Sequence, residues 1–187
     1  MPVTTLDRKT ALIVVDLQKG IFNLPCIHPV AGVIERTCAL LDAFRQRDLR
    51  VVLVNVTGGA PGRTEQSRRF STPPVGFSDL IPELDRHASD IVVTKRTWGA
   101  FASTDLEAQL KANGVTQVVV TGVATGTGVE ATARQAYEQG FNVTLALDAM
   151  TDVRPEAHEY SLASVFPRLG ETGSTEDILN LLARRNA

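Results

Sequence analysis

Residues 117–147, QVVVTGVATGTGVEATARQAYEQGFNVTLAL, carry the clearest structural pattern in the chain. This stretch begins with an apolar, β-branched run that is typical of a buried strand, and a turn of Gly and Thr follows. Residues 129–140 then repeat apolar side chains at helical spacing and stop at Gly140, a usual C-terminal stop. A second apolar run occupies 141–147. The order strand, helix, strand predicts two parallel strands joined by a helical crossover.

The same alternation fills the rest of the chain. Further helices are predicted at 30–49 and 103–114, and further strands at 11–15, 50–56 and 90–94. The apolar runs are nearly continuous rather than alternating, as strands buried on both faces require. The pattern therefore predicts an α/β fold with three layers, in which helices cover both faces of a parallel sheet, and a single domain over the whole chain.

Composition excludes several classes of partner. The net charge is −2 and the pI is near 5.9, so the chain lacks the basic surplus that binds nucleic acid or anionic membranes. The polar N-terminal residues fit neither a signal peptide nor a membrane span, and we expect a cytoplasmic protein. Cys26 and Cys38 are too few for a disulfide framework. His28, His87 and His158 have no metal-ligand spacing, so we expect no metal or other cofactor and a small-molecule substrate.

Polar residues follow three of the predicted strands. Asp16 ends ALIVVD, Lys95 ends DIVVTK, and the Gly/Thr turn 122–128 ends QVVVT. Ligands of open parallel sheets bind outside the carboxyl ends of the strands, so these groups are predicted to share one site. We expect Asp16 and Lys95 to form an ion pair at the ends of neighbouring strands, and the turn to supply N–H donors for developing negative charge. An N-cap for Asp16 and a solvated charge for Lys95 are the alternatives.

Three ordered motifs resemble the isochorismatase-like hydrolases, also called the cysteine hydrolase superfamily. They are ALIVVDLQKGIF, VVTKRTWGAFASTDLEAQL and VVVTGVATGTGVEATARQAYEQGFNVTLALDAMTD, and together they cover most of the chain. The resemblance implies a parallel sheet of about six strands and a homo-oligomer of two to four subunits. It also places the link Val123–Ala124 where the family often has a non-prolyl cis peptide bond.

The chain departs from most of that family at one position. Where the amidases have a nucleophilic Cys, this sequence has Gly128, so covalent catalysis by a thiolate is not carried over. Thr125 and Thr127 are possible substitutes, although neither has an evident activating base in the sequence. Isochorismatases resemble the other members but have Gly at this position, and they hydrolyse an enol ether to release pyruvate. Their chemistry needs a protonated acid, a role that fits a buried Asp16 next to Lys95.

Further substrate contacts are predicted near these groups. They are Gln18, Phe22, Arg69, Trp98 and Phe101, together with Ala124, Thr125 and Thr127 of the turn. The aromatic side chains would wall an apolar pocket, with core packing as the alternative for Phe22 and Phe101. Arg63, Arg68 and Arg69 lie in the irregular segment 56–80, a predicted lid, where they would bind a substrate carboxylate, with a solvated face as the alternative for at least two of them.

These observations predict a hydrolase of a small metabolite. Its catalytic groups would be Asp16, Lys95 and Gly128, and its reaction an acid–base hydrolysis of an enol ether without a Cys nucleophile. Two alternatives remain open at this point. One is a catalytically silent family member that binds a ligand or a partner, and the other is an amidase with a Thr nucleophile.

Overall fold

The computed structural model describes residues 3–22, 24–66 and 73–184. Its centre is a sheet of six parallel strands in the order β3-β2-β1-β4-β5-β6. The strands are β1 (Thr10–Val15), β2 (Arg50–Val56), β3 (Ile91–Lys95), β4 (Gln117–Val123), β5 (Asn142–Thr151) and β6 (Glu171–Gly173). This arrangement confirms the predicted α/β fold with a parallel sheet of six strands.

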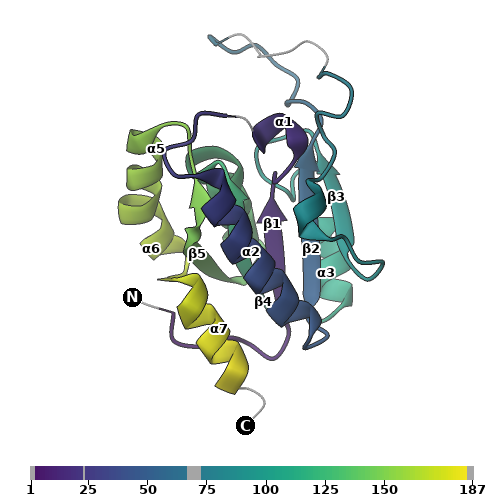
Figure 1. Cartoon of the computed structure of the whole chain (residues 1–187), viewed down its shortest axis with the longest axis vertical. Helices are drawn as coiled ribbons and strands as arrows, with labels where there is room; N and C mark the ends of the chain where they lie inside the picture. The colour runs from purple at the N-terminus through teal and green to yellow at the C-terminus, as the bar shows by residue number, and fades with distance from the viewer. Residues whose placement is uncertain (1–2, 23, 67–72, 185–187) are drawn as a thin grey trace.

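Helices cover both faces of the sheet (Figure 1). They are α1 (Lys19–Phe22), α2 (Val30–Arg45), α3 (Leu106–Ala112), α4 (Glu130–Glu138), α5 (Pro155–Tyr160), α6 (Phe166–Leu169) and α7 (Thr175–Arg184). A short 3-10 turn, η1 (Pro82–Leu84), and two π-helical turns, η2 (Thr125–Val129) and η3 (Ser161–Val165), complete the chain. None of the described helices is both long enough and apolar enough to cross a membrane.

Strand β1 shows why the sequence produces three layers. All of its residues are buried, and successive side chains point to opposite faces of the sheet. Ala11, Ile13 and Val15 belong to one hydrophobic cluster, which also includes buried residues of α3, α4 and α6. Leu12 and Val14 belong to a second cluster with α2 and α7, which Figure 1 shows in front of the sheet. A strand buried on both faces must be apolar throughout, and the run ALIVV meets that requirement.

The described parts of the irregular segment after β2, residues 57–66 and 73–80, lie beyond the carboxyl end of the sheet, away from the helical layers (Figure 1). It returns to the body at Leu80, which forms an isolated bridge with Gln18. Arg63 is exposed, whereas Arg68 and Arg69 lie outside the described residues. The role of the segment as a lid therefore stays a prediction.

Candidate active site

Asp16 is the first residue beyond β1, and its backbone turns sharply there. Its φ angle is 53°, in the left-handed region that Asp and Asn adopt more readily than most residues. The Asp16 amide still donates to the Val54 carbonyl oxygen of β2 at 2.9 Å, so the strand ends immediately after it. The side chain is only 8 % exposed. The carboxyl group is thus fixed at the carboxyl edge of the central strand, largely out of water.

Lys95 reaches the same point from the last position of β3. Its Nζ lies 2.8 Å from Asp16 Oδ2 and donates a second hydrogen bond of 2.5 Å to the Trp98 carbonyl oxygen. Strand β2 separates β1 from β3, so the prediction that the pair stands on neighbouring strands is wrong. The contact forms because the long Lys side chain spans the end of β2, with the whole residue only 1 % exposed.

The two neighbours of the Asp16 carboxyl act on its pKa in opposite directions. Burial, the larger influence, raises the pKa from 3.8 to about 6, and the charge and hydrogen bond of Lys95 lower it only in part. Lys95 occupies Oδ2, whereas Oδ1 is buried with no hydrogen-bond partner among the described residues. The group can therefore carry a proton on Oδ1 at a pH near 6 while Oδ2 keeps its contact with the ammonium.

The turn after β4 approaches Asp16 from the other side. Gly122 pairs with Val15 at the ends of β4 and β1, with a φ of 119°. A Cβ at this position would lie 2.1 Å from the Val15 carbonyl oxygen, so only Gly permits the approach. The Val123–Ala124 peptide bond that follows is cis, as the resemblance implied, and η2 begins at the next residue.

Gly128 in η2 faces the Asp16 carboxyl directly. A Cβ built on it would lie 3.1 Å from Asp16 Oδ2, 3.0 Å from Val15 Cγ1 and 3.2 Å from the Val123 carbonyl oxygen. The residue is buried, and its φ angle lies outside the positive region. The absence of a side chain at this position therefore leaves a narrow space beside Asp16, and the backbone conformation itself does not require Gly.

The turn offers fewer free N–H donors than the sequence suggested. The Thr127 and Val129 amides both donate to the Ala124 carbonyl oxygen at 3.1 Å. The Gly126 amide donates to Asp152 Oδ2 at 2.7 Å. These three donors serve the turn itself, so negative charge on a substrate would have to be met by other groups, and Lys95 is the cation already in place.

Helix α4 connects the turn to the segment that carries Lys95, a link that the sequence did not reveal. The Thr132 hydroxyl donates to the Gly128 carbonyl oxygen at 2.7 Å and accepts from the Ala100 amide at 3.2 Å. Gln135 Oε1 accepts from the Phe101 amide at 2.9 Å. Trp98, whose carbonyl oxygen accepts from Lys95, comes just before Ala100 and Phe101 in the chain. Helix α4 therefore holds both the segment that contacts Lys95 and the turn that contains Gly128. Helical spacing alone would mark both side chains as ordinary surface polar residues.

The predicted substrate contacts Gln18, Phe101 and Trp98 differ in their burial and in their partners. Gln18 is fully buried and engaged with backbone, because its amide donates to the Val56 and Phe77 carbonyl oxygens and its Oε1 accepts from the Val56 amide. Phe101 is 4 % exposed and packs in the core against Phe141, with ring centroids 6.0 Å apart. Trp98 is 68 % exposed, so its ring does not enclose the site.

The three remaining predicted contacts are Phe22, Thr125 and Thr127. Phe22 ends α1, and its side chain is outside the described part of the chain. Thr125 is fully buried, and its Oγ1 lies 2.9 Å from His158 Nδ1, so a titratable partner that the sequence did not indicate stands beside this hydroxyl. Thr127 is partly exposed on the same turn.

Neither cysteine is placed as an activated nucleophile. Burial and the nearby Asp152 raise the pKa of the Cys26 thiol. Burial and the carboxylates of Asp42 and Glu83 raise the pKa of Cys38, whose Sγ donates to the Glu83 carbonyl oxygen at 3.2 Å. A raised pKa leaves less thiolate, which is the reactive form. Within the described ranges, no three His, Cys, Asp or Glu side chains come together as a metal-ligand set.

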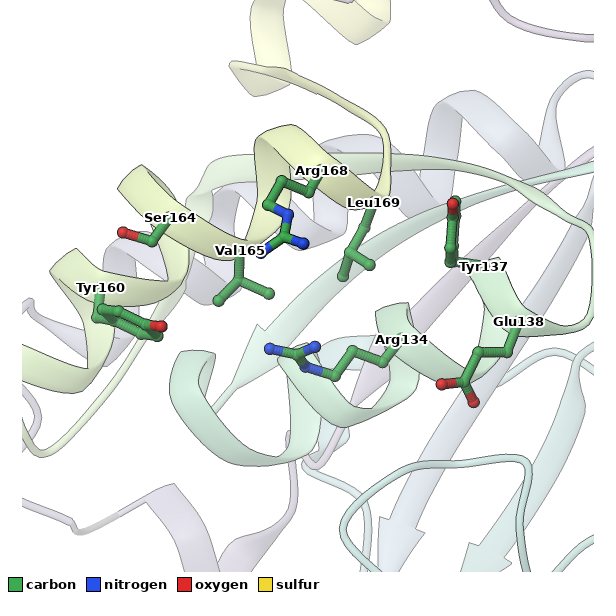
Figure 2. A pocket seen from close by; sticks show the side chains of 8 residues that line it. All are labelled: Arg134, Tyr137, Glu138, Tyr160, Ser164, Val165, Arg168 and Leu169. Atoms are coloured by element: carbon green, nitrogen blue, oxygen red, sulfur yellow. The ribbon is translucent and has the colours of Figure 1, made fainter.

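The hollow beside Asp16 is small. It is lined by Asp16, Leu17, Gln18, Ile21, Val30, Ile81 and Val123, and it has no volume open to a water molecule. A larger hollow of about 250 Å³ lies away from this site, between α4 and α6, where Figure 2 shows the guanidinium groups of Arg134 and Arg168 directed into it. That hollow contains none of the predicted catalytic groups. Because the hollow beside Asp16 has no room for a water molecule, access of a substrate to Asp16 requires a movement of the residues around it.

Comparisons with known proteins agree with one another. Residues 10–177 match the family model of the isochorismatase domain. The chain is 38 % identical to the isochorismatase family protein YwoC of Bacillus subtilis, over 92 % of this chain and 93 % of that protein. The structure of an isochorismatase family protein from Burkholderia thailandensis superposes with a TM-score of 0.85 at 37 % identity, covering 96 % of this chain and 98 % of the other. The ureidoacrylate amidohydrolase RutB of Methylorubrum extorquens is 29 % identical over 79 % of this chain and 72 % of its own length.

Proposed function

The chain belongs to the isochorismatase family of hydrolases, and from that premise we propose that it hydrolyses the enol ether of a small anionic metabolite by acid–base chemistry at Asp16. One observation supports this reaction more than any other. A carboxyl group whose pKa lies at about 6 is buried beside the missing side chain of Gly128, where a nucleophile would otherwise stand. The site is therefore built for proton transfer and lacks a side chain for covalent attack.

The reaction begins with a proton transfer to carbon. Asp16 gives its proton to the terminal vinyl carbon of the substrate, and an oxocarbenium ion forms at the carbon that bears the ether oxygen. Asp16 Oδ1, which has no partner among the described residues, is the oxygen from which this proton leaves. Water then adds to the cation, Asp16 takes the proton that the water releases, and the hemiketal breaks down to a ketone and an alcohol.

Lys95 assists this step without donating a proton to the substrate. As Asp16 loses its proton, a carboxylate develops 2.8 Å from the Lys95 ammonium. The attraction between them is greater in the transition state than in the resting, protonated acid, and such differential stabilisation is what accelerates a reaction. The burial that holds the proton on Asp16 before the reaction also strengthens this attraction as the charge develops.

Amide hydrolysis by a Thr nucleophile is the second candidate, and one observation favours it. Thr125 Oγ1 is within hydrogen-bond reach of His158 Nδ1, the arrangement of a nucleophile and its base. However, Thr125 is 0 % exposed, so its hydroxyl has no open path to a carbonyl carbon. The third possibility, a silent member that only binds a ligand, leaves unexplained why a buried ion pair between Asp16 and Lys95 stands at the carboxyl edge of the sheet.

A substrate screen followed by one substitution tests the proposal. We expect the purified protein to release a 2-keto acid from enolpyruvyl ethers and no ammonia from amides. Asp16→Asn should lower turnover by about 10²–10⁴-fold, the range for loss of a general acid, while the fold persists. Asp48→Asn is the matched control, because Asp48 is exposed and has a φ of 52°, close to the 53° of Asp16. Unchanged turnover in Asp16→Asn, or release of ammonia instead of the keto acid, would refute the proposed reaction.

A further inference from the structure

Two histidines from distant parts of the chain meet behind the turn that carries Gly128. The rings of His28 and His158 are 5.0 Å apart in an edge-to-face arrangement. His158 on α5 contacts Thr125 Oγ1 at 2.9 Å, and His28 Nδ1 lies 3.3 Å from Thr151 Oγ1 at the end of β5. None of these side chains has a part in the chemistry proposed for Asp16.

Helix α5 also packs directly on the turn. A Cβ at Gly126 would lie 2.8 Å from Ala157 Cβ, so the two backbones approach as closely as a Gly permits. Asp152, which is 1 % exposed, accepts from the Gly126 amide at 2.7 Å and from the Arg154 amide at 3.0 Å. The turn is therefore held by α5 and Asp152 on one side, while Gly128 faces Asp16 on the other.

We propose that His158 is a positioning residue for the acid–base reaction: through its hydrogen bond to Thr125 it holds the turn so that Gly128 keeps the space beside Asp16 open. The inference rests on the proposed function, because it assigns His158 a role in the same reaction. Thr125 is the link, since its fully buried hydroxyl has His158 as its side-chain partner and lies three residues before Gly128.

The protonation state of His158 controls this contact. Burial and the neighbouring His28 lower the pKa of His158, whereas Asp152 and Glu159 oppose them. Other ionisable groups near the cluster are Cys26, on the loop before His28, and Glu130 of α4, which accepts a hydrogen bond from Ser161 at 2.6 Å. At neutral pH His158 is uncharged and its ring is bonded to Thr125. At lower pH both ring nitrogens become donors, so Thr125 can only accept from Nδ1, and the charged ring faces His28 within a buried site; this cost weakens the hold of His158 on the turn.

The contact between His158 and Thr125 predicts that the reaction rate falls at low pH, through a titration separate from that of Asp16. Proton uptake by Asp16 at lower pH prepares the general acid, so that group alone would make the rate rise as the pH falls. Protonation of His158 acts in the opposite sense. The rate should therefore pass through a maximum in the acid range, and only its low-pH side should depend on His158.

Two substitutions at His158 and one control separate the positioning role from simple packing. His158→Phe keeps a ring but removes the hydrogen bond, and His158→Asn keeps a polar atom near the place of Nδ1 but cannot titrate. His87→Phe is the matched control, because the His87 side chain is 48 % exposed and pairs with Asp85 far from the turn in sequence. Thr125→Val removes the hydroxyl at nearly constant volume and replaces His158→Phe if that variant does not fold.

The first measurement is hydrogen–deuterium exchange of peptides covering residues 124–130, with a peptide of α2 as internal reference. It needs no substrate and so stays informative if the proposed reaction is wrong. We expect faster exchange of the turn in His158→Phe, and exchange near the wild-type rate in His158→Asn and His87→Phe. Unchanged exchange of the turn in both His158→Phe and Thr125→Val would overturn the proposal.

The second measurement is the pH profile of kcat with an enolpyruvyl ether as substrate. His158→Phe should lower kcat by about tenfold, the loss expected when a buried polar group loses its partner, and change KM less than kcat. His158→Asn should keep most of kcat near pH 7 and lose the acid limb. An acid limb that persists in His158→Asn would contradict the proposal. So would a loss of all activity in both His158 variants with normal exchange, because that result would identify a Thr–His nucleophilic pair.

Discussion

The raised pKa of Asp16 predicts an unusual pH dependence of folding stability. Carboxylates that are paired or hydrogen-bonded in the folded state are usually stabilised as anions, so their proteins lose stability as the pH falls. Asp16 behaves in the opposite way, because burial outweighs Lys95 and raises its pKa from 3.8 to about 6 in the folded chain. Between these two values the folded state binds a proton that the unfolded state has released. The free energy of unfolding should therefore fall as the pH rises from about 4 to about 6.

The size of this effect follows from the same two values. Each pK unit corresponds to about 1.4 kcal/mol, so a rise from 3.8 to about 6 makes the fold about 3 kcal/mol less stable above pH 6 than it would be with Asp16 at its ordinary value. The penalty is absent below the unfolded-state pKa, grows through the window and is constant above it. A domain is typically stable by about 5–15 kcal/mol, so a change of this size is measurable.

Asp16→Asn isolates this contribution, because the amide cannot titrate. Urea unfolding of the wild type and the variant would be measured at half-unit steps from pH 4 to pH 8, and the difference in unfolding free energy plotted against pH. Loss of the partner of Lys95 moves the whole curve of the variant, whereas the titration of Asp16 changes only the slope. We expect the wild type to lose about 2.5 kcal/mol relative to the variant across this range, because part of the effect lies below pH 4. Parallel curves would show that the folded-state pKa of Asp16 is ordinary, and would remove the basis for a general acid at this position.

Two further substitutions test the neighbours of Asp16. Lys95→Met removes the ammonium that lowers the pKa of Asp16, so the basic limb of the rate profile should move to higher pH while kcat falls. A limb that moves to lower pH would contradict this, and Lys111→Met, at an exposed lysine of α3, is the control. Gly128→Cys would place its Cβ 3.1 Å from Asp16 Oδ2, so it should reduce native turnover without giving amidase activity. Gly128→Ala should reduce turnover as well, because the Cβ alone fills the space beside Asp16. Full turnover of the enol ether by Gly128→Ala would show that this space has no role.

Much of the fold was predictable because its strands are buried on both faces. The runs ALIVV and QVVVT have no polar alternation, and the structure places them in β1 and β4, the two central strands. Strand β6 was missed because it has only three residues and begins with Glu171. Helix α7 was not predicted either, although it has one apolar and one polar face. No apolar strand follows it in the sequence, so it was not recognised as the helix of a crossover.

The order of the strands in space could not be predicted from the sequence. Asp16 and Lys95 were expected on neighbouring strands, yet β2 lies between them. Consecutive elements often pair, but the chain here winds from β1 outwards to β3 and then returns across β1 to β4. The ion pair forms because all parallel strands end at one edge and Lys95 has four methylene groups with which to cross β2. The edge was predictable from strand direction, whereas the pairing depended on the length of one side chain.

The contacts behind the turn were harder to predict, because they depend on packing between elements far apart in sequence. Thr125 meets His158 across 33 residues only because α5 folds back over η2. In the sequence, His158 is one polar residue on a short helix, and nothing in its spacing distinguishes it from a surface side chain. A buried histidine is recognised only when its partner is known, and the partner depends on the tertiary fold.

The position of Asp16 explains why the acid and the ammonium have to occur together. Burial alone would raise the pKa of the carboxyl so far that the proton would not leave, since the carboxylate would form in an apolar site without a partner. Lys95 alone, at an exposed site, would hold Asp16 as a carboxylate and leave no proton to give. At 2.8 Å from the ammonium and only 6 % exposed, Asp16 has its pKa at about 6, between these two limits. A general acid must both hold and release a proton near the working pH, and the ion pair in a buried site satisfies both conditions with two side chains.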